Sequence, residues 1–510
     1  MAKSIAVIIV LMLSFNTTAY AKLGDNGFEG GISSGRVLTP LDNHARAADK
    51  QTYPYTELVL VTGVPIVFSG TVMVTRSVKN DIESFAYSYS LTNGAKNKLT
   101  RTVTYQAVIT ENDNQIIRVM ATKQGAKPKE TIVIDGTTYS LKTANDYNFS
   151  LSTINDLQPA CDYYAGNWAG EKIYKTNNGK TITVSMTSQI CGYDQYWGAT
   201  ETQNINIRIS GETDQKNVYD LWGGSGTFKI SSTMSNTLSY IENKPDAISF
   251  EGGYLRKQVN NSILTYNINL PLFDSKGIAT DSIVNYSDTM SLGSFPQQER
   301  LAIGDTSAIK GHWYEENVRQ LLSLGIIDSR FISHYWEFEN YISRKEFAKN
   351  VVESVKITPL DITEPAMSAG RRKNEEVIIP LHFNDVRQND EYYQYIFTAY
   401  KTGIMQGVSD FLFSPNEPLT RAQALVISVR LLGLESIVRS NALITNFNDN
   451  DEIPDWARNA VVVASKIELV NGDEHRNLNP NANLTKAEAI TLLNNLIGFM
   501  RDDMANHYRQ

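Results

Sequence analysis

Between residues 52 and 286, apolar and polar positions alternate in the pattern of half-buried β-strands. Across residues 85–91 every second residue is phenylalanine, tyrosine or leucine, and the turn signal Asn93-Gly94 follows. Asp135-Gly136 separates two further strand-like runs, and such dipeptides favour the tight turns of β-hairpins. We therefore predict an all-β antiparallel region, either a sandwich or a long curved sheet, which could divide into two sub-domains near residue 159.

After Pro296 the apolar period changes to about 3.6 residues, which is typical of amphipathic helices. The stretches 312–327, 391–407 and 454–472 each have this period, and each precedes a polar connection and a second helical segment. The change of period predicts a separate all-α domain, joined to the β region through residues 287–298.

The first residues are typical of a secretory signal peptide. Lys3 precedes an apolar stretch, and Ala19-Tyr20-Ala21 has the small residues of a cleavage site. An uncleaved N-terminal anchor is the alternative. No later segment reaches the ~18 apolar residues that a membrane-spanning helix needs, so we expect no membrane insertion. The predicted divisions are a signal peptide at 1–21, a β-rich domain at 22–296, and helical units at 297–358, 381–436 and 444–500.

The net charge of the chain limits the kinds of binding partner, and its two cysteines bear on its redox state outside the cell. A net charge of -8 over 510 residues argues against nucleic acid or an anionic membrane surface as the partner. Cys161 and Cys191 are the only cysteines, and in an exported chain we predict a structural disulfide between them, with two free thiols as the alternative.

Catalytic and metal motifs are scarce. Of the six histidines only His44 precedes the helical region, which argues against a Ser-His-Asp triad or a histidine-rich metal site in the β region. We expect no metal and no cofactor. A pair of carboxylates, as in glycosidases, is not excluded by the sequence. For Trp168, Trp197 and Trp222 we weigh burial in the core or in turns against exposed contacts to a carbohydrate or a protein.

The second helix of each unit starts with the same motif. A Ser or Thr stands three residues before a Glu or Gln, which is the pattern of a capping box. The three pairs are Ser343 with Glu346, Thr420 with Gln423, and Thr485 with Glu488. An aspartate lies 35 to 38 residues before each cap, and an aromatic residue follows it on the first helix. These landmarks are Asp305 with Trp313, Asp385 with Tyr393, and Asp449 with Trp456. Three matched sets predict an internal triplication.

A cation follows each cap, at the first helical position: Arg344, Arg421 and Lys486. The positive end of the helix dipole disfavours a cation there. A cation beside free helix N–H groups would make a good anion receptor, so we predict a binding role for all three. Exposed cations without a role are the alternative.

At these residues the sequence resembles the S-layer-homology (SLH) family. The second unit carries Phe383-Asn384-Asp385 and Thr420-Arg421-Ala422-Gln423, and the third carries Trp456-Ala457 and Thr485-Lys486-Ala487-Glu488. The first unit lacks the opening phenylalanine of the pattern. The resemblance covers about 200 of the 510 residues.

The resemblance implies one pseudo-threefold helical domain with grooves between its units. Such grooves bind a secondary cell-wall polysaccharide, often one with a pyruvate ketal, or in some organisms peptidoglycan. The three cations would then meet the ketal carboxylate, while the aspartates and aromatic residues would contact the sugar. Core packing is the alternative for the tryptophans, and capping of a local turn is the alternative for the aspartates.

From this resemblance we expect an extracellular protein of the cell wall or surface layer (S-layer), attached non-covalently and performing no chemical step. Self-association of the β region in a surface array is the first hypothesis for its role. A wall-tethered module that binds a glycan or a protein is the second, and a surface glycoside hydrolase is the third.

Overall fold

The computed structural model describes residues 29–34, 48–79, 82–112, 114–212, 221–242, 252–275, 278–328, 335–365, 376–435 and 444–504. The predicted signal peptide at 1–21 lies outside the described residues. Within these ranges no helix has the length and apolar character needed to cross a membrane.

The described elements are mainly strands up to residue 302 and mainly helices after it. The strands are β1 (Gly31–Ser33), β2 (Ala48–Val59), β3 (Ile66–Lys79), β4 (Ile82–Asn93), β5 (Asn97–Asn112), β6 (Gln115–Thr122), β7 (Lys129–Ile134), β8 (Thr137–Ser140), β9 (Tyr147–Leu157), β10 (Asp162–Thr176), β11 (Thr181–Asp194), β12 (Gly198–Glu212), β13 (Leu221–Ile241), β14 (Gly253–Phe273), β15 (Ala279–Gly293), β16 (Gln297–Ala302), β17 (Thr363–Pro365) and β18 (Glu376–Ile378). The α-helices are α1 (Glu315–Ser323), α2 (Arg344–Ser354), α3 (Tyr393–Lys401), α4 (Arg421–Leu431), α5 (Asp455–Lys466) and α6 (Lys486–Gly498). Short helical turns are η1 (Ala144–Asp146), η2 (Ser307–Ile309), η4 (Tyr335–Glu339), η5 (Asn450–Glu452) and η6 (Phe499–Asp503).

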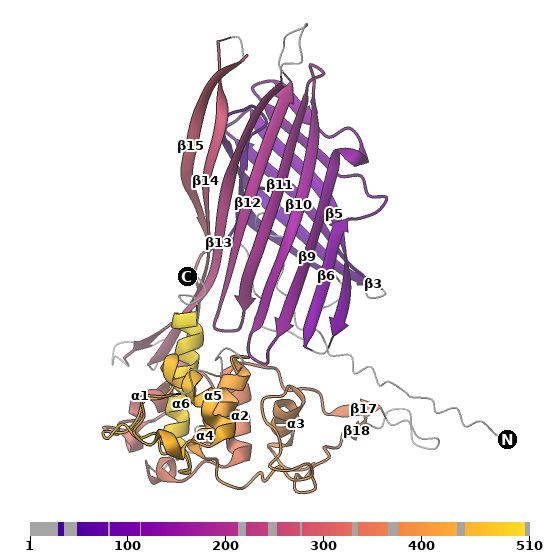
Figure 1. The fold of residues 1–510 in the computed structure, drawn as a ribbon. Coiled ribbons are helices and arrows are strands. Elements are labelled where there is room, and N and C mark those ends of the chain that lie inside the picture. The colour runs from indigo at the N-terminus through magenta and orange to yellow at the C-terminus, as the bar shows by residue number, and fades with distance from the viewer. Residues whose placement is uncertain are drawn as a thin grey trace, which may run out of the picture.

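Strands β1 to β16 form one antiparallel sheet, and most neighbours in it are consecutive in the chain. The hairpin β7–β8 bridges β5 and β10. The sheet curls so far that β1, at one end, contacts β14 and β15 near the other, and Figure 1 shows one wall of strands crossing behind the other. This confirms the predicted antiparallel region in its long curved form. The predicted division near residue 159 is wrong, because β9 and β10 pair on either side of it.

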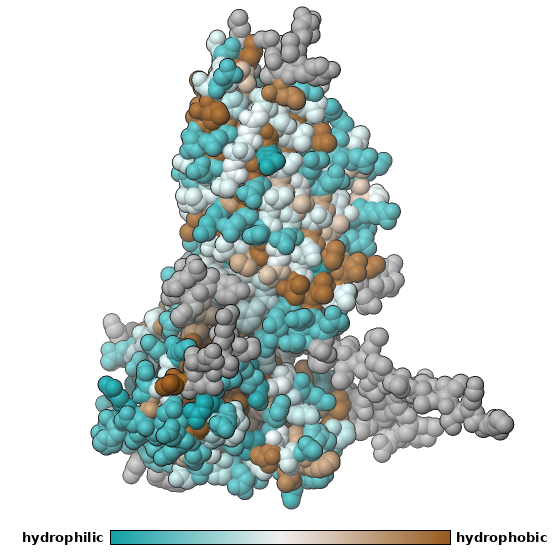
Figure 2. Space-filling view, in the orientation of Figure 1, coloured by the Kyte–Doolittle hydropathy of each residue, from teal (hydrophilic) through white to brown (hydrophobic). Residues whose placement is uncertain are grey.

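The alternation of the sequence becomes the two faces of the sheet. On β4, Phe85, Tyr87, Tyr89 and Leu91 are all buried on the concave side. Asp135 and Gly136 both have positive φ, at 48° and 85°, as a two-residue hairpin turn of type I′ requires. The outward face carries mostly small polar residues, so it is largely teal and white in Figure 2.

The concave core also contains charged side chains. Arg101 donates to Glu57 and to Glu130 at 2.7 Å each, and Lys172 pairs with Glu29 and Glu130. All five side chains are at least 95% buried. Burial alone would raise the pKa of Glu130, but Arg101 and Lys172 lower it to about 2. Arg101 and Lys172 thus keep Glu130 ionised inside the sheet, whereas burial raises the pKa of Glu57.

The sheet extends past the predicted domain boundary at residue 296. Strand β16 pairs with the first half of β14, from Gly253↔Ala302 to Gln258↔Gln297. The helical domain therefore begins after Ala302, and the predicted start of its first unit at residue 297 is corrected.

The predicted disulfide between Cys161 and Cys191 is wrong, since both thiols are free. The strand register gives the reason. Cys191 lies opposite Ala165, four residues along β10 from Cys161. Four strand residues span about 13 Å, whereas the Cα atoms of a disulfide lie within about 7 Å.

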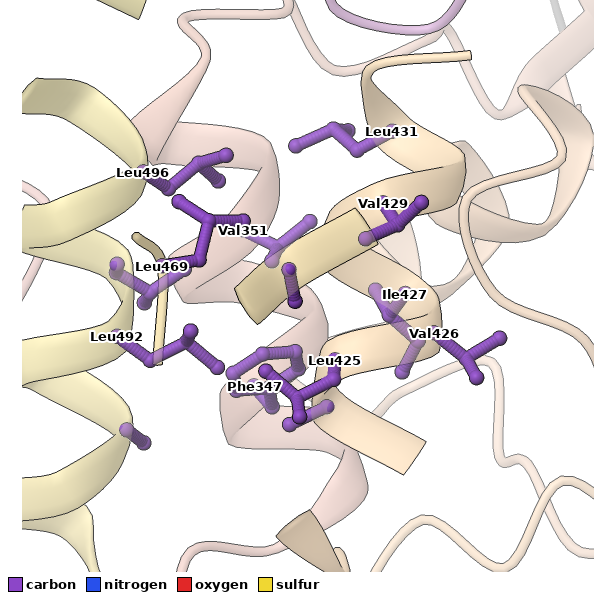
Figure 3. Packing of buried hydrophobic residues seen from close by; sticks show 14 of the residues in the cluster. Phe347, Val351, Leu425, Val426, Ile427, Val429, Leu431, Leu469, Leu492 and Leu496 are labelled. Atoms are coloured by element: carbon purple, nitrogen blue, oxygen red, sulfur yellow. The ribbon is translucent and has the colours of Figure 1, made fainter. Parts of the chain in front are cut away.

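The helical domain is built cyclically. The first helix of each unit packs on the second helix of the unit before it, so that α3 contacts α2, α5 contacts α4, and α1 contacts α6. Apolar side chains of the second helices converge at the centre (Figure 3). They include Phe347 and Val351 of α2, Leu425 and Val429 of α4, and Leu492 and Leu496 of α6.

The two domains share a buried junction, visible in Figure 1 where strand ends of the sheet meet the helices. The indole Nε1–H of Trp197 donates to the carbonyl of Ser354 at the end of α2. Ala160 N–H donates to the carbonyl of Leu431 at the end of α4. Gln195 donates to a carbonyl of η6, which continues α6. Because the ends of all three second helices contact the sheet, the junction lies over the centre of the helical domain.

The three tryptophans of the β region are all buried. Trp168 and Trp222 belong to the core of the sheet, and Trp197 belongs to the junction. Their role is therefore packing, the first of the two roles weighed from the sequence.

Candidate functional site

Each second helix begins with a complete capping box. The Ser343 hydroxyl accepts from Glu346 N–H, and the Glu346 carboxylate accepts from Ser343 N–H at 2.9 Å. The same reciprocal pairs form between Thr420 and Gln423 and between Thr485 and Glu488. Since these contacts span only three residues, the sequence could specify them locally.

The residues just before the caps join the three units in a closed ring. Ile342 N–H donates to Leu484 at 3.0 Å, Leu484 N–H donates to Leu419 at 2.8 Å, and Leu419 N–H donates to Ile342 at 3.1 Å. The first unit donates one of these hydrogen bonds and accepts another, as each of the other two units does. The ring places the starts of α2, α4 and α6 around one pseudo-threefold axis.

The first backbone N–H groups of these helices are not free, which corrects the predicted anion receptor. The N–H of Arg344 donates to the carbonyl of Glu417, and the N–H of Arg421 donates to that of Ala482, both at 3.0 Å. The N–H of Lys486 donates to the carbonyl of Asn340 at 2.9 Å. Each helix start is thus capped by a loop of the neighbouring unit.

The three cations also reach into neighbouring units. Arg344 is 5% exposed, and its guanidinium donates to the carbonyls of Phe413 and Gln406, both at 2.8 Å. Burial lowers its pKa. Arg421 donates to the carbonyl of Leu478 and forms an ion pair with Glu488. These two arginines connect units.

The third cation, Lys486, forms an ion pair with Glu346 at 2.7 Å. Cations of units 2 and 3 therefore meet the carboxylate at the third helical position of the next unit. The equivalent position for Arg344 is Gln423, which carries no charge. The sequence showed this glutamine, whereas the equivalence of its position follows from the ion pairs of Arg421 and Lys486.

Two of the aspartates that were predicted to contact the sugar accept hydrogen bonds from the backbone of a loop in their own unit. Asp385 accepts from the N–H groups of Phe413 and Ser414, at 2.9 and 2.7 Å. Asp449 accepts from Leu478 and Asn479 in the same way, at 2.8 and 2.6 Å. The second donor in each pair, Ser414 or Asn479, has a positive φ, so the carboxylate holds a sharp turn.

Asp305 accepts from Ser307 N–H at 2.9 Å, and this backbone hydrogen bond lowers the pKa of the carboxyl. Capping of turns, the alternative considered for the aspartates, therefore describes all three. No contact with a ligand is needed to explain them.

The predicted aromatic residues divide into two kinds. Trp313 and Trp456 are 62% and 60% exposed, so core packing does not explain them. Tyr393 is 1% exposed, and its hydroxyl donates to the Ile379 carbonyl at 2.8 Å while accepting from Leu381 N–H. The predicted sugar contact of Tyr393 is therefore corrected to a structural role.

The equivalent of the two tryptophans in unit 2 is a different residue. Trp313 and Trp456 each lie twelve positions before the residue of positive φ that follows their helix, Gly325 and Glu468. Twelve positions before Gly403, the matching residue of unit 2, is Glu391. The aromatic position is thus present in units 1 and 3 and absent from unit 2.

A pocket of about 40 Å³ lies where all three units meet. Its wall combines apolar residues with two cations, two carboxylates and an amide. The lining residues are Ile327, Asp328, Phe338, Ile342, Glu346, Lys349 and Asn350 of unit 1, Tyr392 of unit 2, and Lys486 and Ile490 of unit 3. The sequence predicted only Lys486 and Glu346 among the polar members. Lys349 and Asn350 were missed because nothing in their local pattern sets them apart from other exposed helix positions.

Within the described residues no cluster of His, Cys, Asp or Glu is arranged to hold a metal ion. The chemistry available at the pocket is hydrogen bonding and charge pairing. Trp313 and Trp456, which do not line the pocket, offer exposed indole rings for stacking.

Residues 382–425 and 446–490 match the S-layer homology domain. The SLH domains place the protein at the cell surface, anchored to the cell wall. The first unit lies outside this match, although the hydrogen-bond ring includes it.

Several proteins are similar to part of this chain. It is 30% identical over 190 residues to an exoglucanase of Acetivibrio thermocellus, covering 37% of this chain and 16% of the relative. An amylopullulanase of Thermoanaerobacterium thermosulfurigenes has the same identity over the same length, which is 9% of that protein. A surface-layer 125 kDa protein of Lysinibacillus sphaericus is 32% identical over 111 residues, 21% of this chain and 9% of the relative. The chain thus covers less than a fifth of the length of these relatives.

Proposed function

We propose that the helical domain attaches the protein to the cell wall by binding an anionic secondary wall polysaccharide. The observation that carries this proposal is the pair of exposed indoles, Trp313 and Trp456, at equivalent positions of two units. An exposed indole offers a flat apolar face on which a sugar ring can stack. The likeness to a surface-layer protein supports the same role.

The charge for an anionic sugar would come from Lys486 and Lys349 at the pocket between the units. Lys486 already pairs with Glu346, so an incoming carboxylate would share or replace that partner. Arg344 is unsuited to this task because its guanidinium is buried and bound to two carbonyls.

For the β region we propose a structural role on the cell surface, forming or decorating a surface layer, without a chemical step. Its buried carboxylates support this role, because Glu57 and Glu130 are held by Arg101 inside the core. The relatives named as an exoglucanase and an amylopullulanase give a hydrolase as the second candidate.

A pull-down of the whole protein with purified cell-wall sacculi tests the anchoring role, before and after acid removal of the secondary polymer. We expect binding to be lost on stripping, and the Trp456→Ala variant to bind at least tenfold more weakly with an unchanged Tm. Phe295→Ala is the matched control, since Phe295 is 96% exposed in the sheet domain.

Equal binding of Trp456→Ala and Phe295→Ala would refute the stacking role of the tryptophan. Undiminished binding to stripped walls would identify peptidoglycan as the ligand in place of the polysaccharide. Release of sugars from the sacculi by the wild-type protein would favour the hydrolase.

A further inference from the structure

Strand β1 lies at the seam where the two ends of the curled sheet approach each other. It pairs with β2 over only three residues, from Gly31↔Glu57 to Ser33↔Tyr55. On its other side it contacts β14 and β15, and the Ser262 hydroxyl donates to the Ser33 carbonyl at 2.8 Å. We call this place, between Tyr55–Glu57 and Ser262, the β1 seat.

The segment fills the seat with buried side chains. Ile32 is 0% exposed and Glu29 is 3% exposed. The Glu29 carboxylate accepts from the hydroxyls of Tyr147 and Tyr105, at 2.6 and 3.1 Å, and pairs with Lys172. Residues 29–34 therefore act as a short complementing strand that is specific for this seat.

The seat does not require its own strand for charge balance. The sheet itself contributes two cations, Arg101 and Lys172, and two carboxyl groups, Glu57 and Glu130. Glu29 adds a third carboxyl group. After its departure Arg101 would still contact Glu57 and Lys172 would still contact Glu130, so the buried network does not prevent the strand from leaving.

The connection to the rest of the chain permits exchange. Thirteen residues, 35–47, separate Ser34 from Ala48. Fully extended, such a length spans roughly 45 Å, which is enough to reach an adjacent molecule.

We propose that β1 is an exchangeable strand, and that residues 29–34 of one molecule occupy the β1 seat of a second copy on the cell surface. The contacts made by the strand are the same within one molecule and between two, so exchange costs little in contact energy. Attachment to the wall would raise the local concentration and favour the intermolecular form. The inference rests on the proposed structural role, since it supplies the contact by which copies would associate.

Disulfide trapping with the full chain tests the exchange, in a Cys191→Ser background. Thr56 lies between two partners, Ile32 of β1 and Ser69 of β3. The variants Ile32→Cys and Thr56→Cys, mixed at high concentration and oxidised mildly, are expected to give a disulfide-linked pair of 57.0 kDa chains. The matched control is Ser69→Cys mixed with Thr56→Cys, which should stay monomeric because β2 and β3 do not separate.

A chain carrying both Ile32→Cys and Thr56→Cys checks that the substituted strand still reaches its seat, because it should close within one molecule when dilute. If that chain does not close, Ser33→Cys with Ser262→Cys takes its place, since these residues are in contact. A double variant that closes, while the mixed single variants give no more linked dimer than the Ser69 control, would overturn the proposal. The sacculus pull-down does not depend on this result, so anchoring and exchange can fail separately.

Discussion

Trp197 and Ser354 are hydrogen-bonded across the domain junction, with the indole Nε1 2.7 Å from the carbonyl oxygen. Trp197 lies between β11 and β12, and Ser354 is the last residue of α2. Both are completely buried. The sheet is therefore fixed to the helical domain by a packed interface as well as by the covalent connection of the chain.

The junction predicts that Trp197→Phe destabilises the protein. The ring would still fill most of the space, but the Ser354 carbonyl would lose its buried donor, at a cost of about 1–3 kcal/mol. Urea unfolding followed by circular dichroism measures this loss. Trp456→Phe, at an exposed position, should leave the midpoint unchanged. Equal midpoints for both variants would contradict the role of the hydrogen bond.

Arg344 and Lys486, which begin α2 and α6, should differ in their effect on stability. Arg344→Ala leaves the buried Phe413 carbonyl and the partly buried Gln406 carbonyl without this donor, so we expect a loss of about 1–3 kcal/mol. Lys486→Ala removes an ion pair whose side chains are both 21% exposed, which contributes roughly 1 kcal/mol or less. Thermal and urea unfolding of both variants would distinguish them. A larger loss for Lys486→Ala than for Arg344→Ala would be inconsistent with the structure.

Tyr393 should affect stability and not wall binding. Tyr393→Phe removes a hydroxyl that bonds to Ile379 and Leu381, and we expect a cost of about 1–2 kcal/mol. The sacculus pull-down, run well below the Tm, should show wild-type affinity. Weaker binding by a variant that is still fully folded would show that Tyr393 contributes to ligand binding.

Asp162 predicts a dependence of stability on pH. It lies opposite Asp194 on the neighbouring strand, and burial, together with the charges of Asp194 and Asp156, raises its pKa from 3.8 to about 8. The folded protein thus holds this proton more tightly than the unfolded chain does. Its contribution to stability is complete below about pH 4 and is lost as the pH rises through 8.

Asp162→Asn should remove this dependence and raise the Tm at pH 8 by about 2–4 °C. Scans at several pH values between 4 and 9 measure the effect. Asp288→Asn, on the exposed strand β15, is the control that should keep the wild-type profile. A variant at Asp162 whose Tm falls with pH as steeply as the wild type would disprove the assignment.

Local patterns in the sequence predicted much of this protein. Alternation fixed which side chains of β4 face the core, and three capping boxes fixed where α2, α4 and α6 begin. Both patterns depend on residues within a few positions of each other, so the sequence carries them directly. The spacing of these motifs also revealed the triplication.

Contacts between distant segments were decided by the tertiary structure alone. The register of β10 and β11 separates Cys161 from Cys191, and packing buries Tyr393 while leaving Trp456 exposed. Arg344 and Lys486 occupy the same position in their units, yet one is buried against carbonyls and the other forms a partly exposed ion pair. The partner of each cation belongs to a neighbouring unit, and its position follows from how the helices pack around the axis. Side-chain periodicity along one segment carries no information about that packing.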